Sequence, residues 1–183
     1  MRETEEQLIQ NAKGGDAASF GTLYDLYMPR IYRFVFLKTH HKEDAEDLTH
    51  QVFINAWQNL YRYESRGFPF SSWLYRIATN AVIDHYRTAK THFPLEAIPE
   101  ELLAKPSEMA QLVDTAIDVH RVRVMLTKLE PDQQNVLLMK FVDDMSNKEV
   151  AEALGKSEGA VRVIQHRAIK KLRELDTELH HYP

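Results

Sequence analysis

The sequence predicts an all-α protein in which two small helical domains are joined by an acidic linker. Apolar residues recur at three- and four-residue steps, and no convincing segment alternates with a period of two. The 6 glycines and 7 prolines cluster between the periodic segments. With 183 residues, 44% of them apolar, the chain is long enough for one large domain or two small ones with packed cores.

Four helices are expected in the first 90 residues, the last two at about 43–59 and 71–87. Thr4 and Gln7 fit a capping box at the start of the first, which glycines 14 and 15 end. Asp16 can cap the second, where Pro29 should cause a kink or a boundary.

Four more helices are expected in the second half of the chain. Their approximate bounds are 107–128, 131–142, 147–154 and 158–175. Pro131 suits a first helical position, Ser146 and Ser157 suit helix caps, and Gly155 suits a helix end.

The formal net charge of -4 lies in one segment of the chain. Residues 1–90 and 116–183 each carry 11 basic and 11 acidic side chains, whereas 91–115 has one basic and five acidic side chains. Segment 91–115 therefore reads as a linker between domains 1–90 and 116–183. It is either a solvated spacer or a strand that enters a basic channel of a partner.

The composition also bears on the setting of the protein. The chain has no cysteine, which excludes disulfides and cysteine zinc sites and fits a reducing cytoplasm. No apolar run approaches the roughly 20 residues of a membrane-spanning helix, and the acidic start does not resemble a signal peptide.

The end of the chain fits a helix-turn-helix motif, since a short amphipathic helix, a glycine turn and a longer basic helix follow one another. Base edges in a major groove are within reach of Glu158, Gly159, Arg162 and His166. Phosphates suit the helix start at Ser157. Other candidates for phosphate contact are Lys156, Arg167, Lys170 and Lys171. The alternative is a solvated basic helix in a bundle.

Helix 71–87 carries an unusual row of aromatic, basic and amide side chains. The row consists of Trp73, Arg76, Asn80 and Arg87, with Asp84 beside it. The preceding loop adds Tyr61, Arg62, Tyr63, Arg66, Phe68 and Phe70. Rings that stack on bases and arginines that hold the backbone suit single-stranded nucleic acid, but aromatics near a helix start also serve as core. The first interpretation requires an accessible row.

Helix 43–59 has an apolar face and a polar one. The polar face carries Asp44, Asp47, Gln51 and Asn55. The acids of its first turn suit the helix dipole. The polar face either serves solubility or docks on a partner helix.

Together these stretches resemble the extracytoplasmic-function (ECF) sigma factors, small two-domain bacterial transcription initiation factors. DAEDLTHQVFINAW (44–57) is similar to the helix that docks on core RNA polymerase. FSSWLYRIATNAVIDHYR (70–87) is similar to the helix that melts and reads the promoter element nearest the start site. Residues 129–172 are similar to the domain that reads the more distant element.

The resemblance implies core RNA polymerase, promoter DNA and commonly an anti-sigma factor as partners, with no cofactor, metal, small-molecule substrate or enzymatic activity. It implies polymerase contacts for Asp44, Asp47, Gln51 and Asn55. It implies capture of the non-template strand by Tyr61, Tyr63, Phe70, Ser71, Trp73, Arg76, Asn80, Asp84 and Arg87. It implies duplex contacts for Lys156, Ser157, Glu158, Arg162, His166, Arg167 and Lys170.

The chain departs from the family pattern at several positions that bear on polymerase docking and promoter choice. His50-Gln51 stands where Gln-Glu is usual, Thr79 where Arg is common, Lys148 where Glu is common and Ala160 where Thr is common.

Two other classes of protein remain as alternatives. A conventional helix-turn-helix regulator would bind duplex DNA as a dimer without polymerase, but would have no use for the row on helix 71–87. An enzyme is disfavoured, since the chain has nine histidines but no His-Glu-x-x-His pattern, Walker glycine loop or nucleophile elbow.

Overall fold

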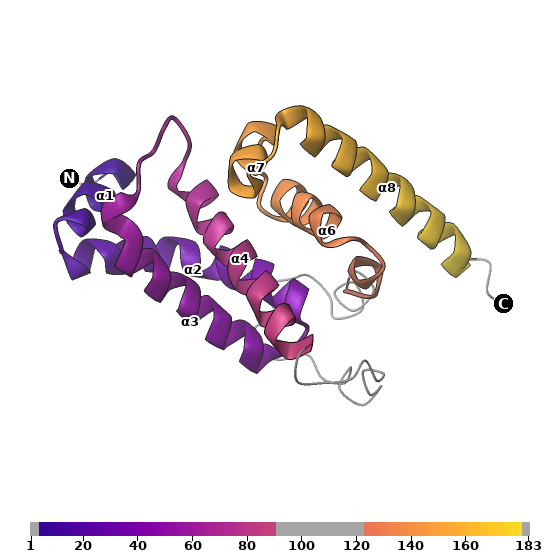
Figure 1. Ribbon diagram of the computed structural model, residues 1–183, viewed down its shortest axis with the longest axis horizontal. Coiled ribbons are helices and arrows are strands. Elements are labelled where there is room, and N and C mark those ends of the chain that lie inside the picture. Colours follow the sequence, from indigo (N-terminus) through magenta and orange to yellow (C-terminus); the bar gives the residue numbers. More distant parts are fainter. Residues whose placement is uncertain (1–3, 91–122, 181–183) are drawn as a thin grey trace.

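The computed structural model describes residues 4–90 and 123–180, and within those ranges it contains only helices and the turns that join them. The predicted all-α fold is confirmed. Figure 1 shows two groups of helices, α1 to α4 in indigo to magenta and α6 to α8 in orange to yellow. The proposed linker 91–115 and most of the helix expected at 107–128 lie outside the described residues.

The first group contains the four helices expected there. They are α1 (Glu5–Lys13), α2 (Ala17–Thr39), α3 (Lys42–Asn59) and α4 (Phe70–Lys90), with a short 3-10 helix, η1 (Leu60–Arg62), after α3. Pro29 does not end α2, which continues for ten more residues. Tyr27 and Ile31 are buried on either side of the proline, so packing holds this helix together across it.

Local capping defines where these helices begin and end. The predicted capping box is present: the Thr4 hydroxyl accepts from the Gln7 amide at 3.3 Å, and the Gln7 side chain accepts from the Thr4 amide at 2.9 Å. The Asp16 carboxylate accepts a 2.6 Å bond from the Ser19 hydroxyl and bonds from two backbone amides, which together lower its pKa. α2 ends at His40, whose φ of 64° is left-handed.

The second group follows the expected order but differs in detail. It contains α6 (Pro131–Leu137), η4 (Leu138–Val142), α7 (Asn147–Leu154) and α8 (Glu158–His180). The helix expected at 131–142 changes to π-helical winding in η4. α8 extends beyond the expected end near residue 175. Ser146 caps α7 in a capping box, and Gly155 ends α7 with a φ of 63°, as predicted.

Each group has its own apolar interior. In the first, Leu23, Phe34, Val52 and Leu74 are completely buried, from α2, α3 and α4. In the second, Val136, Met139, Val150, Val161 and Ala168 are completely buried. Each group therefore has the core that a domain requires.

The two domains touch through α7 on α4 and η4 on α2. Arg30 of α2 donates to the main-chain oxygen of Asp143 at 2.7 Å, and its Nε lies 3.5 Å from Asp143 Oδ1. Lys38 of α2 donates to the Asn135 side chain, and Arg76 of α4 donates to Glu152 of α7. Lys38, Asn135 and Asp143 are buried, so this contact between the domains includes polar and charged groups at buried positions.

Replacing the α7 cap by Ser146→Ala should lower the free energy of unfolding by about 1 kcal/mol, because the Glu149 amide loses its acceptor. Urea denaturation followed by circular dichroism measures the change. Ser146→Asp, which keeps a capping oxygen, is the control and should stay close to the wild type. Equal losses in the two variants would contradict the capping role.

Candidate nucleic-acid interface

The predicted row on α4 is accessible over most of its length. Asn80, Asp84 and Arg87 are exposed, and Trp73 and Arg76 are half-buried. Arg87 Nη2 lies 3.2 Å from Asp84 Oδ1, one turn earlier on the same helix. The opposite face of α4 packs into the core through Leu74, Ala78 and Val82. The helical period therefore holds the row at the surface, as the strand-binding interpretation requires.

Several of the aromatic residues expected at this interface instead form its support. Tyr63 and Phe70 are buried at 7% and 1% exposure, with ring centroids 5.2 Å apart, and Trp73 packs on both. Burial raises the pKa of Tyr63 to about 12. Ser71 is also buried. In this conformation Tyr63, Phe70 and Ser71 offer little surface to a base, because each is buried, although Tyr63 lines the cavity beside the loop.

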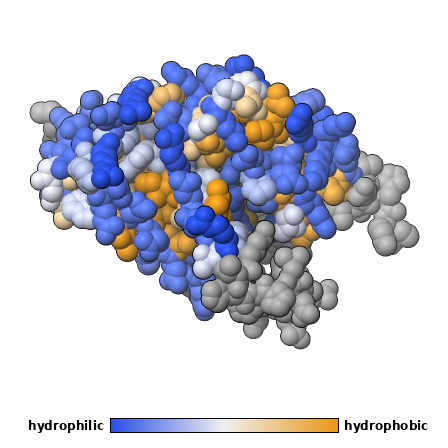
Figure 2. Space-filling model, viewed as in Figure 1, coloured by the Kyte–Doolittle hydropathy of each residue, from blue (hydrophilic) through white to orange (hydrophobic). Residues whose placement is uncertain are grey.

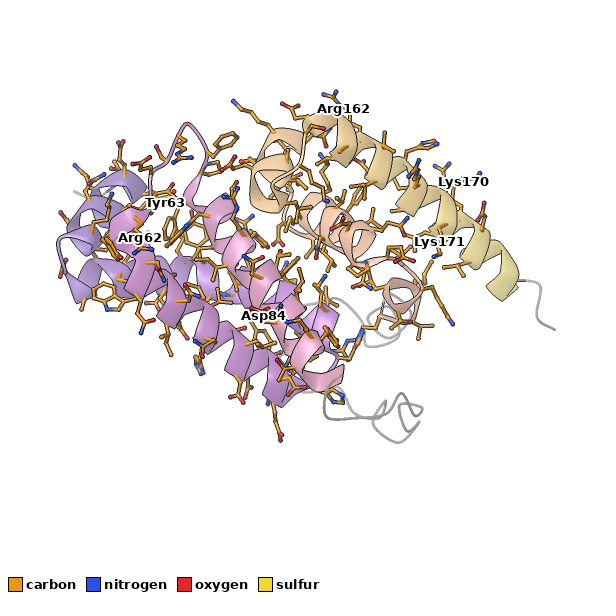
Figure 3. All side chains as sticks on the ribbon, in the orientation of Figure 1. Arg62, Tyr63, Asp84, Arg162, Lys170 and Lys171 are labelled. Atoms are coloured by element: carbon orange, nitrogen blue, oxygen red, sulfur yellow. The ribbon has the colours of Figure 1, made fainter. Side chains whose placement is uncertain are left out.

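The loop itself presents a different set of groups to solvent. Tyr61 is 60% exposed, and the Arg62 guanidinium lies 5.1 Å from the centre of its ring. Lys13 of α1 donates a 2.8 Å bond to the main-chain oxygen of Tyr63, which ties the loop to the first helix. A cavity of about 160 Å³ lies between this loop, the start of α4 and Glu152 of α7. Figure 3 shows Arg62 and Tyr63 close together beside α4.

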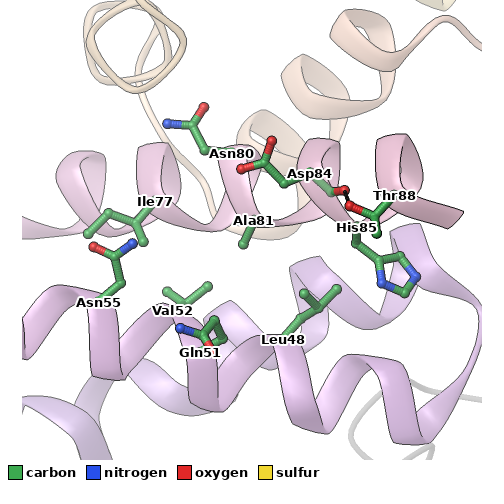
Figure 4. A pocket seen from close by; sticks show the side chains of 10 residues that line it. All are labelled: Leu48, Gln51, Val52, Asn55, Ile77, Asn80, Ala81, Asp84, His85 and Thr88. Carbon is green, nitrogen blue, oxygen red and sulfur yellow. Dashed lines mark hydrogen bonds between the residues drawn. The ribbon is translucent and has the colours of Figure 1, made fainter. Parts of the chain in front are cut away.

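A wide groove of about 830 Å³ runs between α3 and α4. It is lined by Leu48, Gln51, Val52, Asn55, Ile77, Asn80, Ala81, Asp84, His85 and Thr88. In Figure 4, Asn55 extends from α3 toward Ile77 on α4, while Asn80 and Asp84 project from the side of α4 that is turned away from α3. Figure 2 shows apolar side chains gathered over these two helices within a mostly hydrophilic surface. Two residues of the predicted polymerase-docking set, Gln51 and Asn55, and two of the predicted strand-binding set, Asn80 and Asp84, thus line one groove.

The polar face of α3 is exposed as predicted. Asp47, Gln51 and Asn55 are exposed, whereas Asp44 is half-buried with Oδ2 3.7 Å from His85 Nε2. His50, one of the departures from the family pattern, is exposed beside Gln51. This face is therefore available to a partner, with Asp44 directed partly toward α4.

The helix-turn-helix has the expected geometry. α7, the left-handed Gly155 and α8 follow one another, and the Ser157 hydroxyl accepts from the Ala160 amide at 3.1 Å. The exposed face of α8 carries Glu158, Arg162, His166, Arg167 and Lys170. Arg162 and Lys170 lie along the outer edge of α8, away from the first domain (Figure 3). The face predicted to enter a major groove is open.

Two charges of this motif already have partners within the protein. Arg162 Nη2 lies 3.4 Å from Glu158 Oε2, with both side chains largely exposed. Lys156 Nζ lies 2.9 Å from Asp132 Oδ2 and is 29% exposed. Lys171 is half-buried. A phosphate would have to compete with Asp132 for Lys156.

Sequence reasoning missed the residues that join the domains, namely Arg30, Lys38, Asn135, Asp143 and Glu152. One signal could have revealed Lys38: it follows Ile31, Phe34 and Val35 at the spacing of a buried face. Burial lowers the pKa of Lys38 to about 8 and raises that of Asp143. A charged residue such as Lys38 on the buried face of a helix indicates that a polar partner from another helix lies against it.

Residues 4–90 and 123–180 contain no group of three or more metal-ligating side chains arranged to hold an ion. No helix in the same ranges is both long and apolar enough to cross a membrane.

An open helix-turn-helix beside a second helical domain is typical of DNA-binding transcription factors. Family models agree with this class: sigma-70 region 2 matches residues 23–91, and sigma-70 region 4 matches residues 120–172.

Curated relatives and solved structures are similar over nearly the whole chain. The ECF RNA polymerase sigma factor SigD of Mycobacterium tuberculosis is 31% identical over 92% of this chain and 82% of its own length. SigW of Bacillus subtilis is 30% identical, over 91% and 93%. BldN of Streptomyces coelicolor is 32% identical over 92% of this chain, which spans 64% of BldN. CnrH, solved with the cytosolic domain of CnrY, has a TM-score of 0.73 at 26% identity, covering 93% of this chain and 96% of CnrH.

The chain belongs to the ECF RNA polymerase sigma factors, which are transcription initiation factors and not enzymes. The prediction of this family from the sequence is confirmed. A conventional helix-turn-helix regulator is not favoured, since both sigma regions match in order.

The burial pattern predicts effects of very different size on stability for two substitutions in α4. Phe70→Ala should lower the free energy of unfolding by about 3–5 kcal/mol, because it removes a buried ring. Asn80→Ala should change it by less than about 0.5 kcal/mol, because this side chain is exposed. Urea denaturation of the two variants measures both values. A large loss for Asn80→Ala would mean that the row serves the core.

Proposed function

We propose that this sigma factor directs core RNA polymerase to promoters through two reading surfaces, one for an unpaired strand and one for a duplex. The observation that carries the proposal is the exposure of the α4 row beside a groove that α3 shares. We assign 1–90 to polymerase docking and near-element recognition, 91–115 to the linker and 116–183 to distant-element recognition. The partners are core polymerase and promoter DNA, which implies a cytoplasmic protein.

The strand-binding surface consists of side chains that the structure leaves accessible. We assign contact with the non-template strand to Tyr61, Trp73, Arg76, Asn80, Asp84 and Arg87. An exposed ring can stack on a base, and arginines can hold phosphates. Extruding a base costs a few kcal/mol, which stacking and a pocket recover. We assign Tyr63, Phe70 and Ser71 a positioning role, since they are buried beneath this surface.

The duplex-reading surface is the outer face of α8 with the turn before it. We assign base-edge contacts to Glu158, Arg162 and His166, and phosphate contacts to Lys156, Ser157, Arg167 and Lys170. Ala160 has no hydroxyl for a phosphate, so the backbone amides at the helix start carry that role.

The polymerase-docking surface is the polar face of α3, with Asp44, Asp47, Gln51 and Asn55. Ile54 and Trp57 add apolar surface on the same helix, at 51% and 38% exposure. Polar groups around exposed apolar side chains suit a protein interface.

An anti-sigma factor is a further partner. RpoE of Bartonella quintana, solved in complex with the anti-sigma factor NepR, covers 86% of this chain with a TM-score of 0.71 at 20% identity, which supports a shared fold. We propose that an anti-sigma factor binds this chain on the surfaces that polymerase and promoter would use.

Trp73→Ala and Asn80→Ala should reduce open-complex formation while leaving the affinity for core polymerase within about twofold. The reason is that both side chains belong to the row on α4 assigned to the strand, and neither belongs to the polar face of α3 assigned to polymerase. Permanganate footprinting of a promoter measures melting, and fluorescence anisotropy measures polymerase binding. Ile83→Ala, an exposed change on the same helix, is the control. Equal loss in both assays would refute the assignment.

Arg162→Ala should weaken recognition of the distant promoter element by roughly 1–3 kcal/mol if the guanidinium contacts a base. Holoenzyme binding to promoters with the intact and the scrambled distant element measures the effect. Lys128→Ala removes an exposed charge outside the motif and serves as the control. If Arg162→Ala weakens binding equally on both promoters, the residue contacts phosphate and does not read sequence.

A further inference from the structure

The first helix, α1, carries no side chain that we assign to polymerase or DNA. Its residues 5–13 precede the match to sigma-70 region 2, which begins at residue 23. α1 nevertheless packs on α2, touches η1, and lines a cavity of about 380 Å³ together with the loop 63–69. In Figure 1, α1 lies beside the base of the loop that leads into α4. The first helix is therefore placed where it can act on this loop.

The loop 63–69 needs support from outside its own residues. Within it, the Phe68 amide donates to the Ser65 main-chain oxygen at 2.7 Å, while the Tyr63 hydroxyl lies 3.5 Å from the Phe68 main-chain oxygen. Arg66 has a φ of 43°, a left-handed conformation that residues other than glycine rarely adopt. A strained conformation of this kind persists only where the surrounding structure holds it in place.

Lys13 of α1 provides part of this support. Its ammonium donates a 2.8 Å bond to the main-chain oxygen of Tyr63, and Lys13 itself is half-buried. A charged donor makes a stronger hydrogen bond than a neutral one. Tyr63 begins the loop, and its ring packs on Phe70 and Trp73. The bond from Lys13 therefore fixes both the start of the loop and the aromatic cluster beneath the row on α4.

A second connection runs from the start of α1 to the same cluster. The Tyr27 hydroxyl of α2 donates to the Glu5 carboxylate. Burial raises the pKa of Tyr27, so this hydroxyl stays protonated and remains a donor at neutral pH. The Tyr27 ring meets Phe70 edge-on, with the ring centroids 5.6 Å apart. α1 thus acts on the cluster at two points, through the backbone of Tyr63 and through the ring of Phe70.

The surroundings of Lys13 favour a supporting role over a contact with DNA. The charged residues that line the cavity between α1 and the loop are Glu5, Glu6, Glu64 and Lys13. Three carboxylates and one ammonium give this lining a net negative charge, which disfavours the approach of a phosphate. The ammonium is also bonded already to the Tyr63 oxygen. Lys13 therefore acts through the loop, without touching the strand.

We propose that Lys13 is a positioning residue for promoter melting. Its bond to the Tyr63 main-chain oxygen holds the loop 63–69 in the conformation that strand capture requires. Tyr61 and Trp73, which stand on either side of this loop in the sequence, can then receive bases of the unpaired strand. α1 supports strand capture in this way and makes no contact with the strand itself. This inference rests on the proposed strand-binding function of α4 and the loop.

Removing the ammonium by Lys13→Met tests the proposal in the full chain with core polymerase. Open-complex formation, measured by permanganate footprinting, should fall by about tenfold, the equivalent of one hydrogen bond from a charged group. The affinity for core polymerase, measured by fluorescence anisotropy, should stay within about twofold, because the polar face of α3 is unchanged. Wild-type melting in Lys13→Met, or an equal loss in both assays, would overturn the proposal.

Three matched variants identify the cause of the loss. Lys13→Arg keeps a charged donor and should recover most of the melting, whereas no recovery would overturn the proposal. Lys128→Met removes the same charge at an exposed position outside the first domain and should melt the promoter like the wild type. Tyr27→Phe keeps the buried ring and removes only the hydroxyl that binds Glu5. It should also reduce melting, and its result decides if thermal unfolding shows that Lys13→Met does not fold.

A double variant separates this inference from the proposed function. If Lys13 acts through the aromatic cluster, Lys13→Met/Trp73→Ala should lose less melting than the product of the two single losses, because the second change removes part of what the first displaces. A loss equal to the full product would mean that Lys13 acts elsewhere, which overturns the inference. Normal melting in Trp73→Ala alone would instead count against the proposed strand-binding function, whatever Lys13→Met shows.

Discussion

The arrangement depends on one constraint: α4 must contribute to the core of the first domain and also present a binding surface. Leu74, Ala78 and Val82 satisfy the first requirement, because they are buried on one side of the helix. Asn80, Asp84 and Arg87 satisfy the second, because the helical period turns them outward. The aromatic cluster of Tyr63, Phe70 and Trp73 connects the two roles, since it fixes the loop from within the core. A helix with a rigid support can hold its exposed side chains in position for a ligand.

Electrostatics explains why two domains need an external scaffold. Residues 1–90 and 116–183 each have as many acidic as basic side chains, so neither domain has a general attraction for DNA. Few counterions are released when such a surface meets phosphates, so we expect binding of promoter DNA by the free chain to be weak. Sequence recognition then depends on a few directed contacts, and core polymerase would hold both domains at the separation of the two promoter elements.

Charged residues of the first domain also form the contact between the two domains. Arg76 belongs to the row on α4, yet in the free chain it binds Glu152, 76 residues further along. Lys38 and Asp143 are charged residues at buried positions, a costly arrangement that is tolerated where partners are provided.

The sequence by itself determined the helices, their caps and the exposed faces of α3, α4 and α8. These features depend on residues at most four apart, such as Thr4 with Gln7 or Ser146 with Glu149, and on periodicity, which requires no knowledge of distant segments. The order of the motifs along the chain was likewise sufficient to identify the family. Only the tertiary structure decided that Tyr63 and Phe70 are interior, that α2 continues through Pro29, and that Arg30, Lys38 and Arg76 meet Asp143, Asn135 and Glu152. The physical reason is that burial and pairing between segments far apart in the chain depend on how whole helices pack, which local patterns do not specify.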